Sequence, residues 1–264
     1  MVSAFRPDLL AGKTAFVTGG GSGICKGIAR AFMAHGANAV IVGRKADRLR
    51  EAAEELARDT GSQCLAAAAD VRDGAQVDAA LGIAVERFGG VDIVVNGAAG
   101  NFLAPAAQLS NNGFKTVLDI DACGTFNVSR AAFDRCLRER GGVILNISAT
   151  LHYAATVMQI HASAAKAAVD AVTRTLAVEW GPLGVRVVGI APGPIDGTEG
   201  MSRLAPAGMK DALTEAIPLR RFGTIEEMGD LAVFLVSDAA RYIHGETVVA
   251  DGGAWLGASA RYLG

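Results

Sequence analysis

The stretch TAFVTGGGSGICKGIARAF, residues 14–32, places a β-branched run, a glycine-rich turn and a helical segment in immediate succession. Glycines in such a turn let the backbone approach a pyrophosphate, whose charge then meets the exposed N–H groups at the helix N-terminus. A glycine cluster alone is a weak signal, but its position directly after the first strand strengthens it. We therefore expect a dinucleotide site formed by Gly19, Ser22, Gly23 and Ile24.

The same alternation of strand and helix continues along the chain and indicates βαβ units around a parallel sheet. Strands are expected at 14–18, 39–43, 64–69, 91–95, 142–148, 185–191 and 246–250. Helices are expected at 24–35, 46–59, 74–88, 108–138, 162–181 and 224–236. The Pro- and Gly-rich segment 192–208 breaks this rhythm, which predicts a substrate lid over about 192–214. The prediction is a single α/β domain over 1–264, with a doubly wound seven-stranded parallel sheet of the Rossmann type.

Composition excludes several classes of partner. The formal net charge of −2 comes from scattered charged residues, so we expect no nucleic-acid partner. Four cysteines without a CxxC pair predict neither a metal site nor a disulfide framework. No run of about 18 apolar residues occurs, so no membrane partner is expected. These features favour a cytoplasmic protein, and the C-terminal RYLG differs from a peroxisomal address of the SKL type.

The end of the second expected strand selects between the two nicotinamide dinucleotides. It reads VGRKADR, where Arg44 and Lys45 would attract a 2′-phosphate and no carboxylate stands close enough to repel it. The sequence therefore predicts NADP(H), and the alternative is two ordinary surface cations at the start of a helix.

Motifs along the whole chain resemble those of the short-chain dehydrogenase/reductase family. They are TGGGSGI (18–24), ADV (69–71), VNGAAG (95–100), Lys166, APGP (191–194) and ADGGAW (250–255). Within that family, longer runs such as AAGNFLAPA (98–106) and APGPIDGTEG (191–200) are most similar to peroxisomal-type 2,4-dienoyl-CoA reductases. The resemblance implies reduction of an acyl-CoA substrate, a homotetramer built on helices 108–138 and 162–181, and further cofactor contacts. Those contacts would come from Asp70, Val71, Asn96, Pro192, Gly193 and Ile195.

The chain departs from the family at three of four catalytic positions. Lys166 remains, but the tyrosine position is Ala162, the serine position is Ala149 and the asparagine position is Asp121. A ketone reductase needs a hydroxyl that protonates oxygen, whereas conjugate reduction of a thioester needs hydrogen bonds to oxygen and a later proton on carbon. The pattern therefore argues against alcohol dehydrogenation and permits reduction of a 2,4-dienoyl-CoA to a trans-3-enoyl-CoA.

Three groups are the candidates for the chemistry. Lys166 would bind the nicotinamide ribose, unless it is a solvent-facing cation. Asp121 would bind a catalytic water, and its alternative is a helix carboxylate that satisfies a backbone group. Asp251 is a second candidate, with a turn-forming role before two glycines as the alternative. His161 is expected to be a helix-start or surface histidine, since it is rotated by about 100° from the vacant tyrosine position.

The expected substrate contacts are Asn101, Phe102, Ser148 and Thr198. For the CoA phosphates, the sequence does not choose among Lys115, Arg203, Arg220 and Arg221.

Cys25 replaces a family glycine and would weaken cofactor binding by crowding the dinucleotide, so Cys25→Gly is expected to tighten cofactor binding. Two competing hypotheses remain: a catalytically impaired NADP-binding protein, and a reductase of another unsaturated acyl-CoA.

Overall fold

The computed structural model describes residues 5–204 and 210–256. Within them, seven strands form one parallel sheet in the order β3-β2-β1-β4-β5-β6-β7. The strands are β1 (Thr14–Thr18), β2 (Asn38–Gly43), β3 (Cys64–Ala68), β4 (Ile93–Asn96), β5 (Gly142–Ile147), β6 (Val185–Pro192) and β7 (Thr247–Ala250). The order reverses direction between β1 and β4, so the predicted doubly wound seven-stranded sheet is confirmed.

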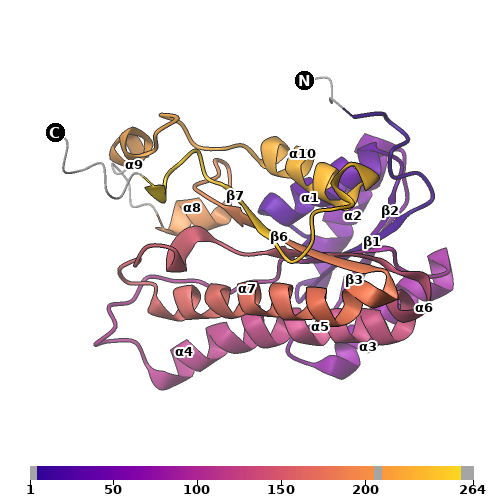
Figure 1. Cartoon of the computed structure of the whole chain (residues 1–264), viewed down its shortest axis with the longest axis horizontal. Coiled ribbons are helices and arrows are strands. Elements are labelled where there is room, and N and C mark those ends of the chain that lie inside the picture. The colour runs from indigo at the N-terminus through magenta and orange to yellow at the C-terminus, as the bar shows by residue number, and fades with distance from the viewer. Residues whose placement is uncertain (1–4, 205–209, 257–264) are drawn as a thin grey trace.

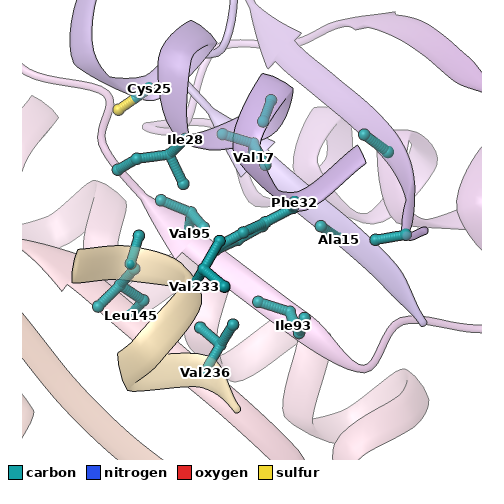
Figure 2. Packing of buried hydrophobic residues seen from close by; sticks show 14 of the residues in the cluster. Ala15, Val17, Cys25, Ile28, Phe32, Ile93, Val95, Leu145, Val233 and Val236 are labelled. Carbon is teal, nitrogen blue, oxygen red and sulfur yellow. The ribbon is translucent and has the colours of Figure 1, made fainter. Parts of the chain in front are cut away.

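Helices cover both faces of the sheet (Figure 1). On one face, α1 (Gly23–Ala34), α2 (Ala46–Thr60) and α10 (Ile225–Val236) enclose a core that includes Phe32 and Val233 (Figure 2). On the other face, α3 (Gly74–Phe88), α5 (Gly124–Ala132) and α7 (Ile160–Trp180) enclose a second core around Leu81 and Leu137. Because helices cover both faces of the sheet, β1 is buried at every position, including Thr14 and Thr18 at its ends.

The single helix expected at 108–138 is a continuous helical stretch interrupted by two π turns. It consists of α4 (Asn111–Leu118), η1 (Asp119–Cys123), α5, η2 (Phe133–Leu137) and α6 (Arg138–Arg140). The stretch starts later than predicted because the Ser110 side chain accepts from the N–H of Gly113 and caps it. A π turn widens the helix locally and is frequent at functional sites, and η1 contains Asp121.

The segment 192–208, predicted to be irregular, contains a helix, so that part of the prediction is wrong. The segment contains helix α8 (Glu199–Leu204), and helix α9 (Lys210–Ala216) follows it. Residues 205–209 between the two helices lie outside the described residues. Helix α8 begins where the Thr198 hydroxyl accepts from the N–H of Met201. Three short 3-10 turns complete the fold: η3 (Thr150–His152), η4 (Gly181–Leu183) and η5 (Asp238–Ala240).

None of the helices in residues 5–204 and 210–256 combines the length and the apolar composition that crossing a bilayer requires. The same ranges contain no group of three or more His, Cys, Asp or Glu residues arranged to hold a metal ion.

Candidate active site

A cavity of about 500 Å³ lies at the carboxyl ends of the strands, where ligands bind in folds of this kind. Most of the residues predicted for the site line it. They are Gly19, Ser22, Gly23, Ile24, Arg44, Asp70, Val71, Asn101, Ser148, Lys166, Pro192, Gly193, Ile195 and Thr198. A larger cavity of about 750 Å³ lies at the amino ends of the strands, between Lys13 and Arg186, and contains none of these residues. We therefore place the candidate active site in the smaller cavity.

The glycine-rich turn lines this cavity with Gly19, Ser22 and Gly23. Gly19 has φ +70°, and a Cβ there would come within 2.6 Å of the carbonyl oxygen of Gly97. Ser22 is the extended N-cap of α1, yet its side chain does not cap the helix, and the first turn carries no acidic residue. The N-terminus of α1 is therefore open to an anion, which fits a pyrophosphate.

Cys25 borders the cavity but fills space on its core side. Its side chain is 5% exposed and belongs to the hydrophobic cluster beneath α1 (Figure 2). A Cβ on Gly97 would lie only 2.0 Å from the Cys25 Sγ, so the thiol takes the space that a side chain at residue 97 would need. Burial raises the pKa of this thiol to about 12, which keeps it protonated. The structure thus changes the expectation of crowding, because the thiol packs against Gly97.

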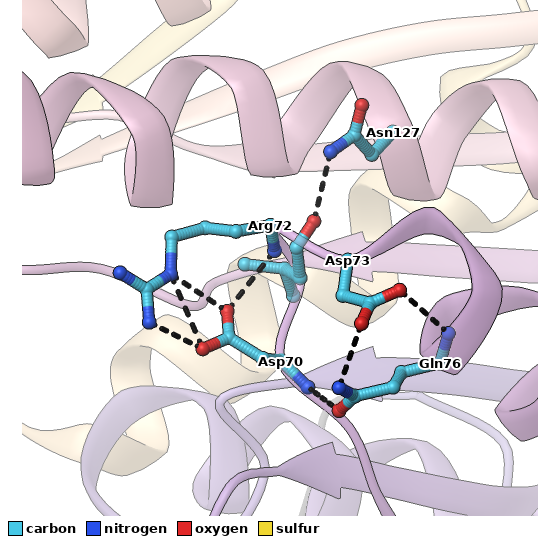
Figure 3. Close-up of polar contacts among 6 residues, drawn as sticks. Asp70, Arg72, Asp73, Gln76 and Asn127 are labelled. Atoms are coloured by element: carbon cyan, nitrogen blue, oxygen red, sulfur yellow. Dashed lines mark hydrogen bonds and ion pairs between the residues drawn. The ribbon is translucent and has the colours of Figure 1, made fainter.

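Of the two cations predicted to bind a 2′-phosphate, the structure places one in the cavity. Arg44 lines it at the end of β2, while Lys45 is the exposed N-cap of α2 and does not. Asp70, predicted to accept from the adenine amine, lines the cavity, but Arg72 holds its carboxylate at 3.0 Å and 3.2 Å through Nε (Figure 3). Hydrogen bonds from Arg72 lower the pKa of Asp70 to about 2. An adenine amine would therefore share this carboxylate with Arg72.

Asp121 and Lys166 form a buried ion pair beside the cavity. The Nζ of Lys166 lies 3.1 Å from Oδ2 of Asp121, and their side chains are 10% and 1% exposed. The Asp121 Oδ1 accepts from the N–H of Gly100 at 2.7 Å, and Lys166 also donates to the carbonyl of Ile147 at 2.9 Å. Lys166 is thus not a solvent-facing cation. Asp121 does bind a backbone group, as its alternative reading requires, but it also pairs with the lysine that lines the cavity.

The positions that the family fills with hydroxyls are apolar here. Ala149 lines the cavity, and Ala162 is 2% exposed in α7. Tyr153 does not replace the missing tyrosine, because its hydroxyl donates to Asp170 at 3.2 Å. The Ser148 hydroxyl is buried in the cavity wall and has no hydrogen-bond partner among the described residues. It is therefore a free donor for a substrate oxygen.

Besides Lys45, three predicted residues, Asn96, Phe102 and Asp251, do not line the cavity. Asn96 does not line the cavity: its amide nitrogen donates to Ser129 and to Asn146, each at 2.9 Å. Phe102 is 42% exposed and stacks on His161. Asp251 borders a different cavity, and its two carboxylate oxygens accept from the N–H groups of Gly253 and Trp255. This is the geometry of the turn-forming alternative for Asp251.

Sequence reasoning missed His161. His161 does lie at a helix start, in the first turn of α7, but its side chain has no exposed surface, so the expectation of a surface histidine is wrong. The sequence did contain a signal for burial, because His161 stands four residues before Ala165 and eight before Val169, on one face of a helix. All three residues are buried in the structure. The ring centroids of His161 and Phe102 are 4.3 Å apart.

Comparison with known proteins agrees with this geometry. The family model described as enoyl-(acyl carrier protein) reductase matches residues 19–254. A curated relative from Pongo abelii, named peroxisomal 2,4-dienoyl-CoA reductase [(3E)-enoyl-CoA-producing], is 52% identical over 96% of this chain and 87% of its own length. A crystal structure of a short-chain dehydrogenase from Bacillus anthracis is 42% identical, with a TM-score of 0.84 over 93% of this chain and 97% of that chain. That of a gluconate 5-dehydrogenase from Burkholderia cenocepacia, in complex with NADP and tartrate, is 30% identical, with a TM-score of 0.87 over 94% and 97%.

The parallel sheet with its glycine-rich first turn defines a Rossmann-type α/β protein. With these matches, the chain belongs to the short-chain dehydrogenase/reductase family, and it is an oxidoreductase. The resemblance inferred from the motifs is confirmed.

The prediction of a cytoplasmic location is contradicted by the same relatives. Those from Pongo abelii, Danio rerio, Rattus norvegicus and Saccharomyces cerevisiae are named peroxisomal. The prediction depended on the cysteine pattern and on the last residues of the chain, and neither determines a compartment.

Proposed function

We propose that this protein is an NADPH-dependent 2,4-dienoyl-CoA reductase that forms a trans-3-enoyl-CoA in the oxidation of unsaturated fatty acids. The observation that carries the proposal is the Asp121–Lys166 pair in a site whose hydroxyl positions are Ala149 and Ala162. Such a site lacks the acid that protonates a ketone oxygen, but it keeps a lysine and a carboxylate beside the cavity. The relatives named 2,4-dienoyl-CoA reductases support the same reaction.

The described residues fit a bound NADPH. The open N-terminus of α1 suits the pyrophosphate, and Arg44 suits the 2′-phosphate. Lys166 would bind the nicotinamide ribose, while Pro192, Gly193 and Ile195 would lie beside the nicotinamide. When bound, NADPH supplies the hydride that the dienoyl chain accepts.

The proton chemistry falls to residues of this chain. Reduction of the conjugated chain spreads negative charge onto the thioester oxygen, and the Ser148 hydroxyl is the free donor for that oxygen. The α-carbon then takes a proton from a water bound to Asp121, and bulk solvent returns a proton to the hydroxide. A carboxylate has about four lone-pair sites, so Asp121 can bind this water as well as Gly100 and Lys166.

The rest of the cavity would position the acyl-CoA. Asn101 lines the cavity, Phe102 would border the acyl chain, and Thr198 belongs to the proposed lid of about 192–214. Asp251 would act by shaping the turn beside Gly193, where a Cβ would come within 2.5 Å of the Asp251 Cβ. The cations considered for the CoA phosphates have partners: Lys115 pairs with Asp119, Arg220 with a backbone carbonyl and Arg221 with Glu227. The side chain of Arg203 lies outside the described residues.

We also propose a homotetramer built on α5 and α7. Phe126 and Val178 are 44% and 79% exposed on these helices, which is unusual for large apolar side chains unless a partner covers them. Analytical ultracentrifugation should give four times the chain mass, and a monomer would contradict the assembly but not the activity.

The direct test of function is oxidation of NADPH in the presence of 2,4-hexadienoyl-CoA, followed by the absorbance of the reduced nicotinamide. Turnover with a 3-enoyl-CoA product is expected. Measurable NADPH binding without oxidation would favour the impaired, cofactor-binding alternative. Turnover with a 2-enoyl-CoA but not with the diene would favour the other unsaturated acyl-CoA.

A further inference from the structure

His161 is a buried titratable residue that the proposed mechanism does not yet use. It lies in the first turn of α7, and its ring stacks on Phe102 with an angle of 28° between the planes. Because it has no exposed surface, its polar atoms cannot be satisfied by bulk water.

The ring nitrogens of His161 make no well-formed hydrogen bond among the described residues, although the Phe102 backbone lies close enough to raise the pKa of the ring. The amide oxygen of Asn101 is also buried and unpaired, although its amide nitrogen donates to Gln159 at 2.7 Å. Buried polar atoms without partners are rare in proteins, so several of them on adjacent segments call for a bound molecule.

These groups surround one short loop. Gly100 donates to Asp121, Asn101 bonds to Gln159, and Phe102 stacks on His161, so residues 100–102 are held between η1 and the start of α7. The His161 ring therefore lies next to the loop whose Gly100 N–H binds Asp121, close enough for the charge of Asp121 to act on its pKa.

The charge state of His161 follows from this position. Burial lowers the pKa of the imidazole below its usual value of 6.5, and the Phe102 backbone and the charge of Asp121 oppose this only in part. The charged group that acts on it is Asp121 on η1, and this carboxylate is paired with Lys166 on α7. A neutral imidazole has one N–H donor and one acceptor, which suits it to orient a water molecule.

We propose that neutral His161 is a positioning residue that orients the water bound to Asp121, together with the amide oxygen of Asn101. The inference rests on the proposed reductase function. His161 transfers no proton in this role: it accepts or donates one hydrogen bond, and the proton that reaches the α-carbon leaves the water. Protonation of the ring at low pH removes its acceptor and should stop this action.

The test compares His161→Phe with the wild type in the NADPH and 2,4-hexadienoyl-CoA assay. Phenylalanine keeps a flat ring stacked on Phe102 but removes both nitrogens. We expect kcat to fall on the order of 10- to 100-fold, with a smaller change in KM and an unchanged Kd for NADPH. The variant should also lack the part of the decrease in kcat towards acid pH that comes from protonation of His161.

Two further variants keep the test decisive. His161→Gln retains a donor and an acceptor but does not titrate, so it should keep more activity than His161→Phe and lose the same acid component. His35→Phe is a matched control. His35 is also a buried histidine, but it lies at the C-terminal end of α1, where its ring contacts the carbonyl of Ala31. Its pH profile should equal that of the wild type.

A His161→Phe variant with kcat within twofold of the wild type and the same acid limb would overturn the inference. So would a His161→Gln variant that keeps the wild-type acid limb. If the wild-type protein itself does not oxidise NADPH with the diene, the proposed function fails instead, and the two failures are thus distinct.

Discussion

The two walls of the cavity are built in different ways. The wall from β1 to β3 would meet the proposed dinucleotide mainly through backbone groups, at the glycine-rich turn and the open N-terminus of α1. The wall from η1 and α7 works through side chains, with Asp121 from η1 and with Lys166 and His161 both from α7. A site made of backbone groups tolerates a changed side chain such as Cys25, provided that a neighbour such as Gly97 leaves room for it. A site made of side chains loses its function when one functional group is removed, because no other group replaces it.

The largest effect is expected from Asp121→Asn. This change removes the proposed water-binding charge, so kcat should fall by about 100-fold or more, while the Kd for NADPH changes only a few-fold. It also leaves the buried Lys166 ammonium without its partner, which is expected to cost about 3–5 kcal/mol of unfolding free energy. Steady-state kinetics, isothermal titration and urea unfolding measure the three quantities.

Asp119→Asn is the matched control for that variant. Asp119 is two residues away in η1, and its ion pair with Lys115 is exposed to solvent, so the change should cost at most about 1 kcal/mol. Equal turnover of Asp121→Asn and Asp119→Asn would remove Asp121 from the mechanism.

The next effect concerns the cofactor wall. Arg44→Ala should weaken NADPH binding by about 10- to 100-fold, since a hydrogen bond to a charged group is worth roughly 1.5–3 kcal/mol. NADH binding should be almost unchanged, because NADH has no 2′-phosphate. Lys45→Ala is the control outside the cavity and should have a smaller effect. An equal loss of affinity for NADPH and for NADH would show that Arg44 does not bind the 2′-phosphate.

A third experiment tests the shared space between Cys25 and Gly97. Gly97→Ala alone should destabilise the protein by about 1–3 kcal/mol, because the new Cβ meets the Cys25 sulfur. Adding Cys25→Ala should recover part of this loss, and the carbonyl of Thr18 at 3.2 Å from the new Cβ limits the recovery. Additive effects in a double-mutant cycle would mean that the two residues do not share one space.

The smallest effect is expected where the cofactor wall contacts the proposed lid. Arg48 on α2 pairs with Glu199 on α8, and both side chains are well exposed. Arg48→Ala should therefore change the unfolding free energy by less than about 1 kcal/mol and raise the KM for NADPH by about fivefold at most. A larger rise in KM would indicate that this pair holds the lid over the cofactor.

Much of the molecule could be predicted because its signals are local in the sequence. Each strand was found within a few residues, since β-branched runs between helical segments identify buried parallel strands. The helix over 108–138 was found as well, but its π turns were not, because the apolar pattern does not report a single extra residue per turn. The helix α8 was missed because Pro and Gly on its N-terminal side suggested an irregular segment.

What the sequence by itself determined is the class of fold, the glycine-rich cofactor turn and the loss of hydroxyls at Ala149 and Ala162. These follow from residues that are adjacent or regularly spaced. Only the tertiary structure decided that Asp121 reaches Lys166, that Asp251 serves a turn, and that the Cys25 thiol packs against Gly97. It also decided that His161 is buried beside Phe102. These outcomes depend on which side chains from different elements come into contact, and the three-dimensional packing of those elements decides that.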